Sequence, residues 1–211
     1  MNTKNVYAVW SGEYDTNNNR TRDLEAAALQ ACINNKNFTH CLEIGCGTGK
    51  NTLTLLHAAD KVTAVDFSEE MLAIAKQKIF SENVSFITAD ITQKWDFAVE
   101  PFDLITFSLV LEHIEDLNEI FKKANTALIV GGTVYVGELH PFKQYTGSKA
   151  RIESKEETLV ADCYIHHLSD FTQYAIDNGF AVTTINEYWD EGDNNGIPRI
   201  LSLLLKKVAN K

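Results

Sequence analysis

The sequence predicts an α/β fold in which a mainly parallel sheet carries helices on both faces. Short apolar runs alternate with stretches of helical periodicity, which is typical of parallel strands joined by crossover helices. The chain has 211 residues, 45% of them hydrophobic, and this suits one domain with a sizeable core. The last two apolar runs have no helix between them, so we expect these two strands to pair antiparallel.

The expected elements follow one another in that alternation. Strands are predicted at residues 39–44, 62–66, 84–90, 102–110, 133–139, 180–189 and 199–207. Helices are predicted at residues 21–34, 50–59, 68–80, 115–128 and 169–178. Ser68 has the side chain of a helix N-cap, and the next two residues are glutamates, which the helix dipole favours in a first turn. The two glycines at 131–132 are expected to turn the chain into the strand that follows.

Charge and composition exclude several classes of protein. The formal net charge is −10, which disfavours a nucleic-acid partner because a phosphate backbone needs a basic face. The N-terminus lacks the features of a signal peptide, and apolar runs such as residues 201–205 are too short to span a bilayer. We therefore expect a cytoplasmic protein without a membrane partner. The four cysteines form no CxxC pair, so we expect reduced thiols and no bound metal.

Residues 41–52 read CLEIGCGTGKNT, with three glycines straight after an apolar strand. A dinucleotide loop, GxGxxG, would need a third glycine where Lys50 stands. A P-loop, GxxxxGK[ST], would need its first glycine at Ile44 and a hydroxyl at Asn51. Each phosphate-binding motif therefore lacks a residue that it needs for the turn or for the ligand. A tight turn between strand and helix, without a ligand, stays open for the loop taken alone.

The loop that remains is ExGxGxG, formed by Glu43, Gly45, Gly47 and Gly49. Together with acids that end the next two strands, it resembles the class I S-adenosylmethionine-dependent methyltransferases, in motif detail over about residues 39 to 140. The resemblance implies a Rossmann-like, doubly wound sheet of seven strands with an antiparallel last strand. It also implies S-adenosyl-L-methionine as the cofactor and S-adenosyl-L-homocysteine as the product.

The resemblance also implies roles for residues near the adenosine. Asp66 would accept hydrogen bonds from both ribose hydroxyls, as a carboxylate can. Phe67 and Met71 would flank the adenine, although Met71 equally suits the core. Asp90 would accept from the adenine amino group, with Ile91 along the ring, although a solvated turn would also explain Asp90.

Residues 102–116, FDLITFSLVLEHIED, resemble the fourth strand of the family and its following loop. The resemblance places Ser108 and Leu109 near the methionine part of the cofactor. His113 would lie near cofactor and acceptor, where it is either a catalytic candidate or a structural residue.

An N-terminal segment comes before the core. Tyr14 and the next residue resemble the Tyr-Asp pair of small-molecule members of the family. Arg22 could bind the cofactor's carboxylate with two hydrogen bonds. Alternatively, Arg22 is a surface charge paired with Asp23 or Glu25.

The expected organisation is a single methyltransferase domain. Residues 1–38 would form an N-terminal cap and helix, residues 39–140 the cofactor-binding core, and residues 141–167 a lid. Residues 168–211 would form the last helix and the pair of C-terminal strands. A domain of this size leaves little room for a module that recognises a macromolecule, and we therefore expect a small-molecule acceptor. We expect the protein to be a monomer or a homodimer.

The acceptor is expected among polar and aromatic side chains of the lid and its neighbours. His140 ends the fifth strand and is a second catalytic candidate, and Arg151, His167 and Trp189 are candidate acceptor-binding residues. Cationic groups gathered in the lid of an acidic protein suggest an anionic acceptor, although solvated charges and a buried histidine would explain them as well.

Methyl transfer is an in-line displacement at the sulfonium carbon and needs mainly alignment and desolvation. A base is needed only where the acceptor must lose a proton. Two alternatives stay open. One is an NAD(P)-dependent oxidoreductase with a degenerate loop, and the other is a non-catalytic S-adenosylmethionine-binding protein.

Overall fold

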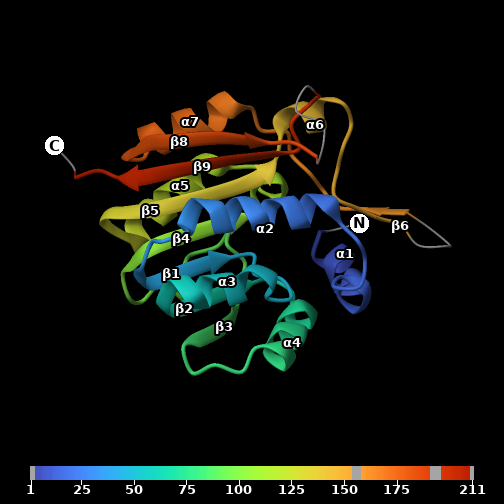
Figure 1. Ribbon diagram of the computed structural model, residues 1–211, viewed down its shortest axis with the longest axis horizontal. Coiled ribbons are helices and arrows are strands. Elements are labelled where there is room, and N and C mark those ends of the chain that lie inside the picture. Colours follow the sequence, from blue (N-terminus) through green and yellow to red (C-terminus); the bar gives the residue numbers. More distant parts are fainter. Residues whose placement is uncertain (1–2, 154–157, 191–195, 210–211) are drawn as a thin grey trace.

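The structure is a computed structural model that describes residues 3–153, 158–190 and 196–209. Seven strands form one sheet in the order β3-β2-β1-β4-β5-β9-β8 (Figure 1). The strands are β1 (Phe38–Ile44), β2 (Ala59–Asp66), β3 (Val84–Thr88), β4 (Phe102–Ser108), β5 (Leu128–Leu139), β8 (Phe180–Tyr188) and β9 (Ile200–Lys207).

The pairing follows the predicted topology. Strands β1 to β5 pair in parallel, and β9 lies antiparallel between β5 and β8. The mainly parallel sheet with an antiparallel last strand is therefore confirmed. Chain order reverses between β1 and β4, and in open α/β sheets a ligand binds at the carboxyl ends of the strands at such a switch point.

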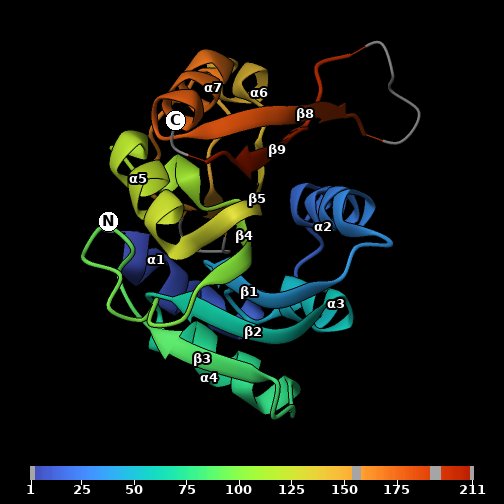
Figure 2. The same ribbon diagram turned by 90° about the vertical axis from the view of Figure 1, so that its left-hand side faces the viewer.

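Helices cover both faces of the sheet, as predicted (Figure 2). Helices α2 (Arg20–Ile33), α3 (Lys50–Ala58) and α4 (Glu69–Lys78) share one apolar core with the sheet. Helices α5 (Leu117–Ala127) and α7 (Leu168–Asp177) share the core on the opposite face. The helices on each face are apolar where they contact the sheet, so both faces of the sheet are buried in an apolar core, which stabilises the fold.

Side-chain caps start three of these helices. The Ser68 hydroxyl accepts from the Met71 amide at 3.2 Å and starts α4, as the sequence predicts. Asn19 caps α2, and Asp116 caps α5, where its carboxylate accepts from the Glu119 amide at 3.0 Å. These caps satisfy amide groups that have no partner within the helix.

Two segments differ from expectation. Strand β5 begins at Leu128 and not after the glycine pair, which lies within an irregularity of its pairing with β4. Gly131 has a φ of +78°, so the chain bends there without leaving the strand. The expected lid also contains regular structure, namely α6 (Pro141–Tyr145) and the hairpin of β6 (Arg151–Glu153) and β7 (Thr158–Val160).

The N-terminal segment contains a helix that the periodicity did not reveal. Helix α1 (Thr3–Trp10) is followed by the short helix η1 (Ser11–Glu13). Figure 1 shows α1 close to β6, at the edge of the sheet where β5 ends. Val6 and Trp10 pack against Met71 of α4 and Ala161. Helix α1 therefore covers the edge where a ligand is expected. Within the described residues, no helix combines the length and apolarity that a membrane crossing requires.

Candidate active site

A cavity of about 330 Å³ opens at the carboxyl ends of β1, β2 and β4. Its wall is formed by the loops that follow these strands, by α1 and by residues near 162. The structure brings most of the predicted cofactor residues together on this wall, with the catalytic candidate His113 beside them: Tyr14, Gly45, Gly47, Asp66, Phe67, Met71, Asp90, Ile91, Ser108 and Leu109.

Glycines in the loop after β1 occupy positions where a side chain would clash or where the backbone has a positive φ. Gly45 has a φ of +71°, and a Cβ there would lie 2.1 Å from the side chain of Val110. Gly47 has a φ of +53° and open space beside it on the cavity side. Gly49 begins α3 with a φ of +83°, and a Cβ would lie 2.6 Å from Ile79. Gly45 and Gly47 thus face the cavity, whereas Gly49 permits close packing of α3 on the segment after α4.

The carboxylate of Asp66 is held by the loop beside it. One oxygen accepts from the Gly47 amide at 2.8 Å and the other from the Ser68 amide at 2.9 Å. Burial raises the pKa of Asp66, and these backbone amides oppose the shift. Each carboxylate oxygen can accept a second hydrogen bond. The group is therefore oriented to receive two hydroxyls from the cavity.

The far end of the cavity is apolar, with one acid at its rim. Phe67, Met71 and Ile91 lie on the wall, and Met71 is buried as well as facing the cavity. Asp90 is exposed, and one of its oxygens accepts from the amide and the hydroxyl of Thr92 at 2.8 and 2.7 Å. A flat heterocycle with an amino group on its edge suits an apolar slot of this kind.

The turn after β4 is strained and firmly held. Leu109 has a φ of +56°, which is unfavourable for any residue other than glycine. Its amide donates a hydrogen bond to the carbonyl of Gly137. The amides of Val110 and Leu111 both donate to one oxygen of Glu138, at 2.9 and 2.8 Å. Such strain persists where the surroundings determine it, and it occurs often at functional sites.

His113 fastens two segments over the cavity. Its Nδ1 lies 2.8 Å from the carbonyl of Asp162, so Nδ1 must carry the proton. In the neutral ring Nε2 is then an acceptor, and it receives the hydroxyl of Tyr7 of α1 at 3.0 Å. No pattern in the sequence pointed to Tyr7, because α1 itself was not predicted. This arrangement gives His113 a structural role at the cavity wall.

Arg22 pairs with neither Asp23 nor Glu25, the two protein partners considered from the sequence. Its two terminal nitrogens donate to the backbone carbonyls of Tyr14 and Asn17, and its guanidinium lies 3.9 Å from the centre of the Tyr14 ring. Asp23 instead pairs with Lys50. Arg22 does not line the 330 Å³ cavity. It lines a second cavity beside it and also a small cavity that Gly45 and Gly47 share, so its contact with the cofactor's carboxylate stays a prediction.

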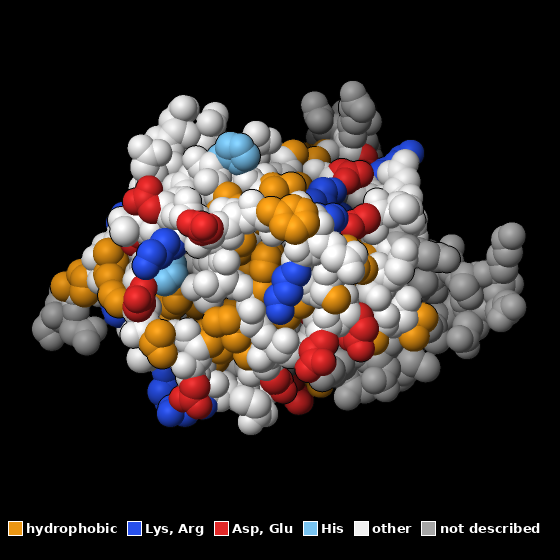
Figure 3. Space-filling model, turned by 90° about the horizontal axis from the view of Figure 1, so that it is seen from below, with side chains coloured by type: hydrophobic (Ala, Val, Ile, Leu, Met, Phe, Trp, Pro, Cys, Tyr) orange, Lys and Arg blue, Asp and Glu red, His pale blue; other side chains and the backbone are white. Residues whose placement is uncertain are grey.

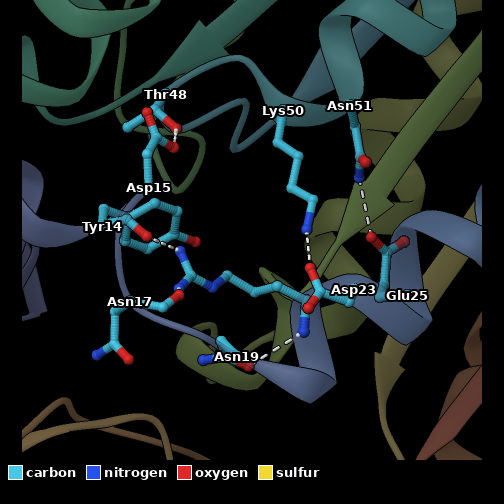
Figure 4. A network of polar contacts seen from close by, with 10 residues as sticks. Tyr14, Asp15, Asn17, Asn19, Asp23, Glu25, Thr48, Lys50 and Asn51 are labelled. Atoms are coloured by element: carbon cyan, nitrogen blue, oxygen red, sulfur yellow. Dashed lines mark hydrogen bonds and ion pairs between the residues drawn. The ribbon is translucent and has the colours of Figure 1, made fainter.

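Polar contacts join the N-terminal segment to the glycine loop (Figure 4). Thr48 donates to Asp15 at 2.6 Å, and the other oxygen of Asp15 accepts from Lys78 of α4 at 2.6 Å. Asn51 donates to Glu25 of α2 at 2.9 Å. The first turn of α3 and the segment before it are therefore held together as one unit around the site.

Glu43 lies beneath the loop in the buried end of β1. Its carboxylate accepts from the Thr52 hydroxyl, and burial raises its pKa to about 8. It lines a small cavity of about 50 Å³ behind Gly45 and Gly47. Glu43 therefore supports the loop from behind and does not line the main cavity.

The second cavity has a volume of about 300 Å³. Tyr7, Tyr14 and Leu109 line both this cavity and the first one, so the two adjoin at these residues. The remainder of its wall is mostly polar: Trp10, Asn19, Thr21, Arg22, Glu112, Leu139, Ser148, Lys149, Ala150 and Arg199.

Among the described residues, none of those predicted for the acceptor lines the first or the second cavity. His140 is buried, with one ring nitrogen 3.2 Å from the Phe142 amide and the other 2.9 Å from Glu187. Burial lowers the pKa of His140, and Glu187 opposes the shift. His167 contacts the hydroxyl of Tyr145 at 2.7 Å.

Of the other two predictions for the acceptor, one residue lies away from these cavities and the side chain of the other falls outside what the structure describes. Trp189 donates to the carbonyl of Gly196 at 2.9 Å. Arg151 begins β6, and its side chain lies outside the described residues. Sequence reasoning placed the acceptor in the lid, whereas the second cavity also draws on α1, α2 and the loop after β4. Within the described chain, no three His, Cys, Asp or Glu side chains gather as metal ligands.

Comparisons with known proteins agree with this geometry. Residues 42–136 match the family model of the methyltransferase domain. The demethylmenaquinone methyltransferase of Staphylococcus aureus is 36% identical over 100 residues, which are 46% of this chain and 41% of the relative. The match therefore spans less than half of the curated relative.

Solved structures share the fold over nearly the whole chain. The DhpI protein in complex with S-adenosylhomocysteine superposes with a TM-score of 0.76 at 21% identity, covering 99% of this chain and 96% of that one. The N-methyltransferase NodS of Bradyrhizobium japonicum gives a TM-score of 0.74 at 18% identity, covering 98% and 99%. Residues 42–136 of the chain therefore match a methyltransferase domain, and the chain shares its fold with these solved structures.

Proposed function

We propose that the protein transfers the methyl group of S-adenosylmethionine to a small-molecule acceptor. One observation carries the proposal. The oriented carboxylate of Asp66, the Gly45–Gly47 backbone and an apolar slot share one cavity, and a second cavity adjoins it at Leu109.

The first cavity suits the cofactor part by part. Asp66 would accept the two ribose hydroxyls, and Phe67 and Ile91 would enclose the adenine. Asp90 would accept from the adenine amino group. The methionine part would then extend along the turn at Leu109 toward the second cavity. When bound, the cofactor supplies an activated methyl group and its own leaving group, so the chain's residues bind, align and exclude water.

The second cavity suits a small acceptor. Its volume of about 300 Å³ is at the lower end of the range for small-molecule pockets. The name of the Staphylococcus aureus relative also points to a small molecule. The face of the protein in Figure 3 carries acidic and basic side chains interspersed around hydrophobic ones, without the uniform basic surface that a phosphate backbone requires.

Calorimetric titration with S-adenosylhomocysteine tests the cofactor site directly, with NAD in a parallel titration. We expect binding in the micromolar range, about −8 kcal/mol, and no binding of NAD. Asp66→Ala should weaken the binding at least tenfold. Asp60→Ala, an exposed acid on the same strand, serves as the matched control and should bind like the unaltered protein. Binding of NAD without S-adenosylhomocysteine would overturn the proposal in favour of an oxidoreductase.

A further inference from the structure

The second cavity is distinguished by buried polar atoms that have no partner in the protein. Among the described residues, seven buried side-chain nitrogen or oxygen atoms form no hydrogen bond. Three of them belong to residues on this cavity's wall, namely Nε1 of Trp10, Nε of Arg22 and Oε2 of Glu112. Trp10 and Glu112 are each only 6% exposed. A buried polar atom without a partner costs about 1–3 kcal/mol, so a ligand that pairs with it recovers that cost.

Two of these atoms are donors, and they lie in cationic surroundings. Trp10 Nε1 and Arg22 Nε each carry a hydrogen, and the Arg22 guanidinium lies 5.5 Å from the centre of the Trp10 ring. Lys149 and Arg199 line the same cavity. An anionic group accepts from such donors and is attracted by the charges.

The charge of Arg22 is available to a ligand, whereas that of Arg199 is already balanced. Arg199 binds both oxygens of Asp190, each at 2.6 Å. Arg22 donates only to backbone carbonyls, and no carboxylate of the described residues lies within ion-pair distance of it. Arg22 therefore attracts an anion in this cavity, and its charge also acts on the carboxylate of Asp15.

The third atom is an acceptor, and it lies close to the cofactor cavity. Glu112 belongs to the short helix η2 (Leu111–His113), and its Oε1 lies 4.0 Å from Nε2 of His113. His113 lines the first cavity and Glu112 the second. The carboxylate of Glu112 is thus beside the boundary that the methyl group would have to cross.

We propose that the second cavity binds a small acceptor with an anionic group and a hydroxyl or amine, and that Glu112 takes the proton of that hydroxyl or amine during methyl transfer. The anionic group faces Trp10 and Arg22, and the nucleophile faces Oε2 of Glu112. The proposal rests on the function proposed above and specifies its acceptor and base.

The step is balanced in atoms and electrons. A lone pair of the acceptor's oxygen or nitrogen forms the new bond to the methyl carbon, and the carbon–sulfur bond breaks with its electron pair left on sulfur. The proton of the acceptor moves to Oε2 of Glu112 and from there to solvent. Burial raises the pKa of Glu112, while the charge of His113 and the polar side chains of Gln144 and Cys163 beside the carboxyl group oppose the shift. A raised pKa makes a carboxylate a stronger base.

The experiment measures release of S-adenosylhomocysteine from S-adenosylmethionine with a panel of small hydroxy acids and amino acids. Each acid is paired with its neutral amide as a matched probe. We expect turnover of one or more acids and at least tenfold lower kcat/KM for the neutral partner. If the unaltered protein binds S-adenosylhomocysteine but methylates no acid of the panel, or methylates the amides equally well, the acceptor class is wrong.

Variants test the two ends of the cavity separately. Glu112→Gln should lower kcat on the best acid about 10²-fold or more and remove the rise of kcat with pH, with affinity for S-adenosylhomocysteine within threefold. Glu115→Gln, an exposed acid three residues along, is the control and should leave kcat unchanged. A kcat within threefold for Glu112→Gln would overturn the role of Glu112 as a base.

Trp10→Phe keeps an aromatic side chain but removes the indole N–H donor and the five-membered ring, and it tests this end of the cavity even if Glu112→Gln does not fold. It should raise KM for the acid about tenfold with little change in kcat. An unchanged KM would contradict an anion at this end. Failure of the unaltered protein to bind S-adenosylhomocysteine would instead reject the proposed function itself, and calorimetry separates these outcomes.

Discussion

The backbone amide of Gly47 donates to the carboxylate of Asp66 at 2.8 Å and so joins the loop after β1 to the end of β2. The second oxygen of Asp66 accepts from Ser68, where α4 begins. One side chain thus fixes a loop, a strand end and a helix start around the cavity. This connection makes Asp66 a structural residue as well as a candidate ligand for the cofactor.

Asp66→Ala should therefore destabilise the protein before any ligand is added. The substitution leaves two backbone amides without their acceptor, and each costs about 1–3 kcal/mol where it is buried. We expect a loss of 2 kcal/mol or more in urea unfolding. Asp66→Asn keeps one oxygen acceptor and should lose about half as much. Equal losses for the two variants would show that the hydrogen bonds of the carboxylate contribute little.

Gly45→Ala tests whether close approach of the backbone shapes the site. The new Cβ would lie 2.1 Å from Val110 at a φ of +71°, so both overlap and backbone strain oppose it. We expect the variant to lose at least 2 kcal/mol of stability and most of its affinity for S-adenosylhomocysteine.

Two other glycines serve as comparisons. Gly47→Ala has a positive φ but open space, so it should show only the cost of strain, about 1 kcal/mol. Gly12→Ala has open space and no positive φ and should stay within about 0.5 kcal/mol of the unaltered protein. If Gly45→Ala were no more harmful than Gly47→Ala, the contact with Val110 would not be limiting.

The buried carboxyl of Glu43 should make stability depend on pH. Its pKa is about 8 in the folded protein, above the ordinary value of 4.5, so the folded state keeps a proton that the unfolded state releases. Stability is then fully present below about pH 4.5 and is lost as pH rises toward 8, by up to about 1.4 kcal/mol per pH unit.

Glu43→Gln removes this titration while keeping a polar side chain of the same shape. The stability of the variant relative to the unaltered protein should rise between pH 5.5 and 7.5, measured by urea unfolding at three pH values. Other buried acids with raised pKa, such as Glu138, contribute equally to both proteins and cancel in the difference. Glu82→Gln, on the surface, is the control. Parallel pH curves for Glu43→Gln and the unaltered protein would show that Glu43 does not titrate in this range.

The sheet and the cofactor cavity could be predicted because their signals are local. Ser68 caps its helix, β2 ends on Asp66, Asp90 follows β3 by two residues, and parallel strands place their carboxyl ends at one edge. The glycine loop has a fixed spacing, and positive φ angles require glycine at Gly45 and Gly47.

The second cavity could not be predicted, because it forms between segments far apart in the chain. Trp10, Glu112 and Lys149 meet only when α1, the loop after β4 and the segment after α6 are folded together. No spacing in the sequence links them. For His140 the sequence was misleading in the opposite way. Its position at the end of a strand predicted a catalytic role, whereas in the fold its two ring nitrogens contact Phe142 and Glu187.

Tyr7 should hold α1 over the cofactor cavity through His113, and Tyr7→Phe tests this contact alone. The phenol donates to Nε2 of His113 at 3.0 Å, and its removal should cost about 1 kcal/mol of the closed arrangement. Because α1 packs mainly against Met71 and Ala161, the core of the sheet should keep its stability. We expect hydrogen exchange of residues 3–10 to quicken about fivefold, and S-adenosylhomocysteine to dissociate faster by a similar factor. Tyr174→Phe, whose ring is 37% exposed on α7, provides the control for loss of a phenol. Unchanged exchange in α1 with faster dissociation would mean that Tyr7 contacts the ligand directly and does not act through the position of the helix.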